Sequence, residues 1–133
     1  MQSLTLIDTS SWIEALRTSG NAEVRNRVKE LLMGGKAAWC EMILLELWNG
    51  AQGESERKIL KDFSMEIPML PISSEVWTLA KRLAQTCRQK GKTVPSTDIL
   101  IVSCGLMNKA DIEHQDNHFD IILNLYSSIL NQH

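Results

Sequence analysis

Short apolar runs alternate with helix-forming segments along this chain of 133 residues. Residues 4–7 form the first run, which stops abruptly at Asp8, and residues 37–39 and 111–114 are further brief runs typical of buried strands. Strands that are separated by helices run parallel, because each helix returns the chain to the same end of the sheet. The pattern therefore predicts an α/β fold, a three-layer sandwich with a central, mostly parallel sheet flanked by helices.

Local signals mark the boundaries of the predicted helices. Ser11 and Glu14 have the spacing of a capping box, which predicts a helix start. Proline-marked alternation over residues 65–72 predicts a strand near the sheet edge, and residues 121–133 fit either a strand or a helix. The other predicted helices, bounded by glycine, serine or proline, cover residues 21–33, 41–49, 55–63, 74–90 and 95–107.

The length and composition predict one domain over residues 1–133, in the size range of a single core. The longest apolar stretch, residues 99–107, is far shorter than the roughly 20 residues of a membrane helix. The first residues lack the basic start of a signal peptide. Three widely spaced cysteines favour reduced thiols over a disulfide or zinc framework. We therefore expect a cytoplasmic protein with no membrane association.

The charge balance excludes a surface that is positive overall. Fourteen Lys and Arg stand against sixteen Asp and Glu, for a net charge of -2. Any contact with RNA must then depend on a local patch. The candidate patch, which also fits the solvated face of an amphipathic helix, consists of Lys81, Arg82, Arg88, Lys90 and Lys92.

Three carboxylates occupy positions where a charge is conspicuous. Asp8 directly follows a buried strand, where desolvation is costly unless a partner compensates. Asp98 falls in the first turn of a helix, where the helix dipole alone favours it. Glu46 lies in an almost wholly apolar helix that we expect to be buried, and buried glutamates are rare without a pair or a metal. Asp8 and Asp116 are both predicted at carboxyl ends of strands, where sites of α/β folds form.

Carboxylates gathered in one pocket repel one another and favour a hard divalent cation, such as Mg²⁺ or Mn²⁺. Such an ion can hold a phosphodiester oxygen and make a bound water more acidic. The acidic residues therefore indicate nuclease or phosphatase chemistry.

The sequence also carries four short motifs in a fixed order. They are Leu6-Ile7-Asp8-Thr9-Ser10, Glu46-Leu47-x-x-Gly50, Pro95-x-x-Asp98-Ile99-Leu100-Ile101 and His114-x-Asp116-x-x-Phe119. In order and context they resemble PIN domains, and in particular the VapC-type toxins of toxin–antitoxin pairs, over nearly the whole chain.

The resemblance implies a compact α/β fold and cleavage of RNA, for example tRNA or rRNA, by a Mg²⁺- or Mn²⁺-dependent endoribonuclease that inhibits translation. It implies a homodimer and a cognate antitoxin protein. Residue by residue, it assigns the metal and the catalysis to Asp8, Glu46, Asp98 and Asp116, with Thr9 or Ser10 as a nearby hydroxyl.

The sequence departs from the family pattern at two positions. Glu41 stands where members often have a small hydroxyl residue, and His118 is a second departure. Asp120 is an alternative fourth acid, but Asp116 fits the step before Phe119 better.

Three other interpretations stay open at this stage. A phosphohydrolase resembling the haloacid dehalogenases would use Asp8 as a nucleophile, but it expects a second Asp where Ser10 stands. His114, Asp116 and His118 could form a transition-metal cluster. A non-catalytic RNA-binding or interaction module would leave the acids structural. Trp12, Trp48 and Trp77 fit either core packing or, where exposed, dimer or antitoxin surfaces.

Overall fold

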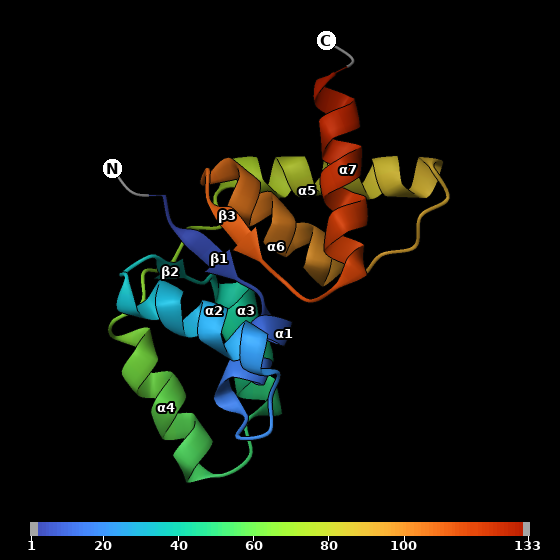
Figure 1. The fold of residues 1–133 in the computed structure, drawn as a ribbon. Helices are drawn as coiled ribbons and strands as arrows, with labels where there is room; N and C mark the ends of the chain where they lie inside the picture. Colours follow the sequence, from blue (N-terminus) through green and yellow to red (C-terminus); the bar gives the residue numbers. More distant parts are fainter. Residues whose placement is uncertain (1–2, 132–133) are drawn as a thin grey trace.

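A computed structural model describes residues 3–131, in which a small parallel sheet lies between two groups of helices (Figure 1). The elements in chain order are β1 (Thr5–Ile7), α1 (Thr9–Leu16), α2 (Ala22–Met33), β2 (Ala37–Ala38), α3 (Glu41–Gly50), α4 (Glu54–Ser64), α5 (Ser74–Gln89), α6 (Ser96–Met107), β3 (Asp111–Glu113) and α7 (Asn117–Leu130).

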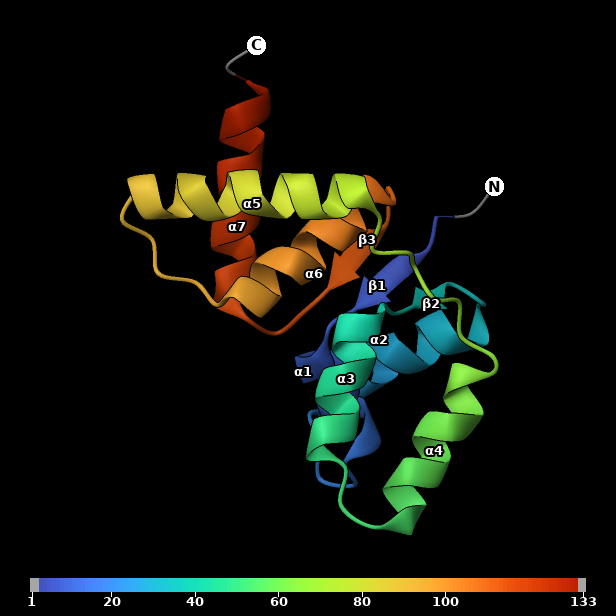
Figure 2. The ribbon, with the colours of Figure 1, turned by 180° about the vertical axis from the view of Figure 1, so that it is seen from behind.

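The sheet has the strand order β2-β1-β3, and both pairings are parallel. Thr5 is opposite Ala37 on one side and Asp111 on the other. The helices α1 to α4 lie on one side of the strands and α5 to α7 on the other, as both views show (Figures 1 and 2). This arrangement confirms the predicted α/β sandwich with a central parallel sheet.

The first helix begins earlier than the capping-box signal predicted. Asp8 is the N-cap of α1, and its side chain accepts a hydrogen bond from the backbone N–H of Ser10. Ser11, the predicted cap, is buried inside the helix. The reason is that Asp8 ends β1 and offers a carboxylate to the first free N–H groups, so the helix starts without a connecting turn.

One predicted strand is absent, and the C-terminal segment that could have been a strand or a helix is helical. Residues 65–72 form no strand; only an isolated parallel bridge joins Met69 to Trp39. Pro68 and Pro71 remove backbone donors from this segment, which limits its pairing. The C-terminal segment is helical, since α7 covers residues 117–130, whereas residues 132 and 133 of the predicted segment lie outside the described residues.

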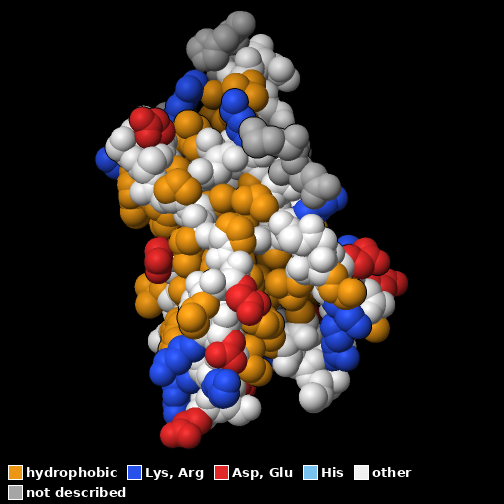
Figure 3. Space-filling view, turned by 90° about the vertical axis from the view of Figure 1, so that its left-hand side faces the viewer, with side chains coloured by type: hydrophobic (Ala, Val, Ile, Leu, Met, Phe, Trp, Pro, Cys, Tyr) orange, Lys and Arg blue, Asp and Glu red, His pale blue; other side chains and the backbone are white. Residues whose placement is uncertain are grey.

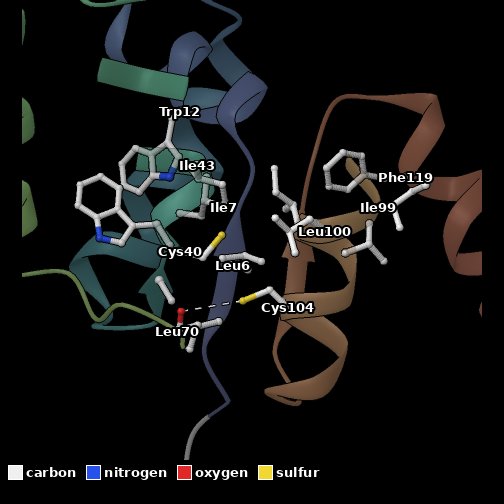
Figure 4. Packing of buried hydrophobic residues seen from close by; sticks show 14 of the residues in the cluster. Leu6, Ile7, Trp12, Cys40, Ile43, Leu70, Ile99, Leu100, Cys104 and Phe119 are labelled. Atoms are coloured by element: carbon white, nitrogen blue, oxygen red, sulfur yellow. Dashed lines mark hydrogen bonds between the residues drawn. The ribbon is translucent and has the colours of Figure 1, made fainter. Parts of the chain in front are cut away.

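The core lies on both sides of β1, whose Leu6 and Ile7 are fully buried. Figure 4 shows Trp12 and Ile43 on one side of this strand and Leu100 and Phe119 on the other. Cys40, Cys87 and Cys104 are free and buried, in agreement with the expected reduced thiols. The sheet therefore joins two apolar layers into one core (Figure 4).

Gly105 explains how α6 approaches the sheet so closely. A Cβ atom at this position would come within 2.8 Å of Ile112 Cδ1 and 3.4 Å of Leu6 Cδ2. The absent side chain lets the helix pack directly on β1 and β3. Within residues 3–131, no helix is both long and apolar enough to cross a membrane.

Candidate active site

Asp8 is held at the carboxyl end of the central strand. Its side chain is 4% exposed, and Oδ2 accepts a hydrogen bond of 2.9 Å from Ser10 Oγ. Ser10 Oγ in turn accepts a hydrogen bond from the backbone N–H of Gln115, in the loop that follows β3. Burial raises the pKa of Asp8 above its ordinary value, and the hydrogen bonds offset part of that increase.

Asp98 lies in the first turn of α6 and has no hydrogen-bond partner for its buried Oδ2 among the described residues. Its pKa is raised to about 6, first by burial and then by the negative charges of Asp116 and Asp8. Glu46 adds to the increase, and His118 offsets part of it. The predicted acids from four separate segments therefore lie within electrostatic range of one another.

Asp116 caps α7, and its Oδ1 accepts a hydrogen bond of 2.9 Å from the backbone N–H of His118. The His118 ring lies against the acids, with Nδ1 3.1 Å from Asp116 Oδ1 and 3.5 Å from Asp98 Oδ2. One ligand atom from each of these three residues lies within 4.8 Å of the other two. Asp120, the alternative fourth acid, is exposed and pairs instead with His114 Nε2 at 3.4 Å.

Glu46 reaches the site from α3, where it is half-buried. Its Oε1 accepts a hydrogen bond of 2.7 Å from Thr9 Oγ1, which fixes the carboxylate beside the start of α1. The helix is less buried than expected, because α3 packs only one face, with Ile43 and Leu47 buried, and leaves Leu45 61% exposed. The glutamate is thus explained by a hydroxyl partner and its position near Asp98, not by full burial.

The donor set fits a divalent cation. Asp98 Oδ2 is buried and accepts no hydrogen bond from the described residues. Burial and the negative charges of the neighbouring carboxylates raise the pKa of Asp98. Oxygen donors crowded in this way are the ligands of hard cations such as Mg²⁺ and Mn²⁺.

The alternative histidine cluster is assembled differently from the sequence-based version. His114 stacks on Phe119, with ring centroids 5.0 Å apart, and pairs with Asp120, so it is not part of the three-residue group. Asp98 takes its place beside Asp116 and His118. The sequence had singled out His118 only as a departure and as part of that alternative; its contact with Asp98 arises from the packing of α7 on α6, which no local spacing reveals.

A groove of about 350 Å³ adjoins the site between α1, α3 and α4. The groove was not predicted from the sequence, where its only signal is apolar residues on the outer faces of helices. Ile13, Leu16 and Ile59 are between 36% and 39% exposed there. The groove is lined by apolar side chains, which include Ile13, Leu16, Leu47, Ile59 and Leu60, and by the charged residues Arg17, Glu46 and Glu56.

The basic residues proposed as an RNA patch are exposed along the second half of α5 and the loop after it. That loop leads to the start of α6, where Asp98 lies (Figure 1). The opposite face of α5 is apolar and buried, as expected of an amphipathic helix. A face of the molecule on the side of the N-terminus mixes both signs of charge with hydrophobic side chains (Figure 3).

A parallel α/β sandwich with four carboxylates gathered past the ends of its strands is the arrangement expected of a PIN domain. The PIN domain family model matches residues 5–122, and the chain therefore belongs to the PIN-domain family. This membership also sets aside the phosphohydrolase interpretation, in agreement with the Ser10 hydroxyl that stands where that class needs an acid.

Named relatives within the family are VapC ribonucleases. VapC ribonuclease Mb1587 of Mycobacterium bovis is 32% identical over 124 residues, which cover 90% of this chain and 91% of the relative. Ribonuclease VapC11 of Mycobacterium tuberculosis matches with the same identity and coverage.

Solved structures with the same fold come from toxin–antitoxin complexes. VapBC2 of Rickettsia felis, bound to a promoter DNA fragment, has a TM-score of 0.73 at 18% identity and covers 89% of this chain and 92% of its own. VapBC-1 of nontypeable Haemophilus influenzae has a TM-score of 0.73 at 16% identity, with coverages of 91% and 92%. At these identities the likeness concerns the fold.

Proposed function

We propose that this chain is a metal-dependent endoribonuclease and the toxin of a toxin–antitoxin pair, which inhibits translation by cutting RNA such as tRNA or rRNA. The observation that carries the proposal is the convergence of Asp8, Glu46 and Asp116 on Asp98, whose pKa their charges help to raise. The ribonuclease names of the relatives support the reaction. The free, buried thiols suit a reducing cytoplasm.

In this proposal Asp8, Asp98 and Asp116 hold a Mg²⁺ or Mn²⁺ ion, and Glu46 completes the set directly or through water. When bound, such an ion acidifies water and stabilises the charge of a phosphodiester under attack. The chain positions its own ligands in advance: Ser10 holds Asp8 and Thr9 holds Glu46. Carboxylates fixed in this way would hold the ion in one defined position.

Cleavage of a pool of structured RNAs by the purified chain tests the proposal. We expect cutting with Mg²⁺ or Mn²⁺ and none with EDTA, because the carboxylates alone cannot stabilise added negative charge. Salt-sensitive RNA binding without cleavage under every metal would instead favour the non-catalytic module, with the basic face of α5 as its contact surface.

We also propose that the cognate antitoxin occupies the groove between α1, α3 and α4. The titles of the structural neighbours, which are VapBC complexes, support an antitoxin partner. The apolar walls fit an amphipathic segment, and Glu46 at the groove fits a basic side chain from it. A partner bound there would place a positive charge next to the acids and so block the site.

Leu16→Glu is the variant that tests this surface. Leu16 is 39% exposed, so the fold should persist, while a charge in the apolar groove should weaken antitoxin binding about 30-fold or more. Titration calorimetry with the antitoxin measures the loss, and Met33→Glu, at a position 78% exposed and outside the groove lining, is the control. If Leu16→Glu and Met33→Glu bind the antitoxin with equal affinity, the groove is not the antitoxin-binding surface. Light scattering of the free chain reports the proposed homodimer in the same samples.

A further inference from the structure

His118 is positioned as part of the proposed metal centre and not as a solvent-facing neighbour of it. Asp116 caps α7 and accepts a hydrogen bond from the His118 backbone N–H, so the start of the helix fixes where the ring emerges. The side chain is 40% exposed overall, but its Nδ1 is buried and has no hydrogen-bond partner among residues 3–131. The buried nitrogen faces the acids, and the rest of the ring faces outward.

The contacts of Nδ1 have the distances of a shared ligand set. Nδ1 lies 3.1 Å from Asp116 Oδ1 and 3.5 Å from Asp98 Oδ2, yet neither contact has hydrogen-bond geometry. Asp98 Oδ2 lacks a donor as well. Atoms that carry lone pairs are brought together favourably when a cation lies between them. The three candidate ligand atoms lie within 4.8 Å of one another, a spacing that one metal ion can bridge.

The other described histidine shows what a structural role looks like in this chain. His114 Nδ1 is likewise buried without a hydrogen-bond partner, but the His114 ring stacks on Phe119, its Nε2 lies 3.4 Å from Asp120, and it takes no part in the three-residue group. His118 has no ring stacked on it in the described structure, and its nitrogen is directed at two carboxylates.

We propose that His118 Nδ1 is a direct ligand of the ion held by Asp98 and Asp116, and that this nitrogen makes the centre select Mn²⁺ or Zn²⁺ over Mg²⁺. Imidazole binds transition ions well, whereas Mg²⁺ is held by oxygen ligands. A mixed set of one nitrogen and several carboxylate oxygens therefore changes the metal preference of the site. The inference rests on the proposed metal centre and specifies its chemistry.

Metal binding to the whole chain, without RNA, is the test. Calorimetric titration should give Mn²⁺ and Zn²⁺ affinities well above that for Mg²⁺, and His118→Ala should lower the Mn²⁺ and Zn²⁺ affinities by about tenfold or more with little effect on Mg²⁺. His118→Asp, an all-oxygen version, should narrow the ratio between Mn²⁺ and Mg²⁺. Pulsed electron paramagnetic resonance of the Mn²⁺-loaded chain should detect an imidazole nitrogen that disappears in His118→Ala.

His114→Ala is the matched control, and it should keep the nitrogen signal and the metal preference. A Mn²⁺ spectrum without nitrogen coupling, or equal metal ratios in the wild type and His118→Ala, would overturn the role of His118 while leaving the proposed nuclease centre intact. Absence of any divalent-ion binding, with Asp98→Asn indistinguishable from the wild type, would overturn the centre itself and His118 with it.

Discussion

Asp98→Asn is expected to abolish RNA cleavage and, at the same time, to stabilise the metal-free protein near neutral pH. Asp98 is the acid on which the charges of the other three converge. Its loss as a ligand should lower cleavage by at least about 100-fold, since even outer-shell partners of metal ligands are worth 10–100-fold. The asparagine keeps the shape of the side chain, so the loss should not come from unfolding.

The stability gain follows from the raised pKa of Asp98, which is about 6 in the folded chain against 3.8 for the free group. Between those values the folded state binds more protons than the unfolded state, so the contribution of this group to stability falls as the pH rises from about 4 to about 6. Asparagine does not ionise. The advantage of the variant should therefore be near zero at pH 4 and reach about 2–3 kcal/mol at pH 7.

Urea unfolding of both proteins in EDTA between pH 4 and pH 7 measures this difference. Asp120→Asn is the control, because Asp120 is exposed and lies outside the cluster. It should cut RNA normally and show no comparable gain. Adding Mn²⁺ should stabilise the wild type and not Asp98→Asn. Full cleavage by Asp98→Asn, or a stability difference that does not depend on pH, would contradict the assignment.

Trp39→Ala should destabilise the fold by about 3–5 kcal/mol, the usual effect of removing a large buried aromatic side chain. Trp39 is 0% exposed and packs on Trp12, with ring centroids 5.3 Å apart. Its backbone also forms the bridge to Met69. A domain of this size has a total stability of about 5–15 kcal/mol, and the variant should be close to unfolding at 37 °C.

The urea midpoint of Trp39→Ala, compared with that of Trp77→Ala, is the measurement. Trp77 is 48% exposed on α5, so its removal should cost less than about 1 kcal/mol. Similar urea midpoints for the two variants would show that burial of the Trp39 side chain does not stabilise the fold by the expected amount.

The parts of the site that follow from local signals were predictable from the sequence. Asp8 ends an apolar strand and Asp98 opens an apolar helix, and both features are visible in a few neighbouring residues. The predicted sandwich and the family resemblance are confirmed by the structure and by the PIN domain match. The metal and catalytic roles of Asp8, Glu46, Asp98 and Asp116 stay predictions, as does the single domain over residues 1–133.

Features that depend on tertiary packing were not predictable in the same way. The burial of Glu46 was overestimated, because the apolar side chain of Leu45 points to solvent and not to the core. The contact between His118 and Asp98 depends on how α7 packs against α6. The strand expected over residues 65–72 is reduced to one bridge by its prolines, which weigh against the apolar alternation.

The pairing of β1 with β3 joins the first described strand to the last, and Asp116 caps the helix that follows that last strand. A ribosome making this protein releases Asp8, Glu46 and Asp98 well before the segment that completes the cluster. Because β3 and α7 bring Asp116 to the other acids, the four predicted site residues come together only once the chain through α7 has been made.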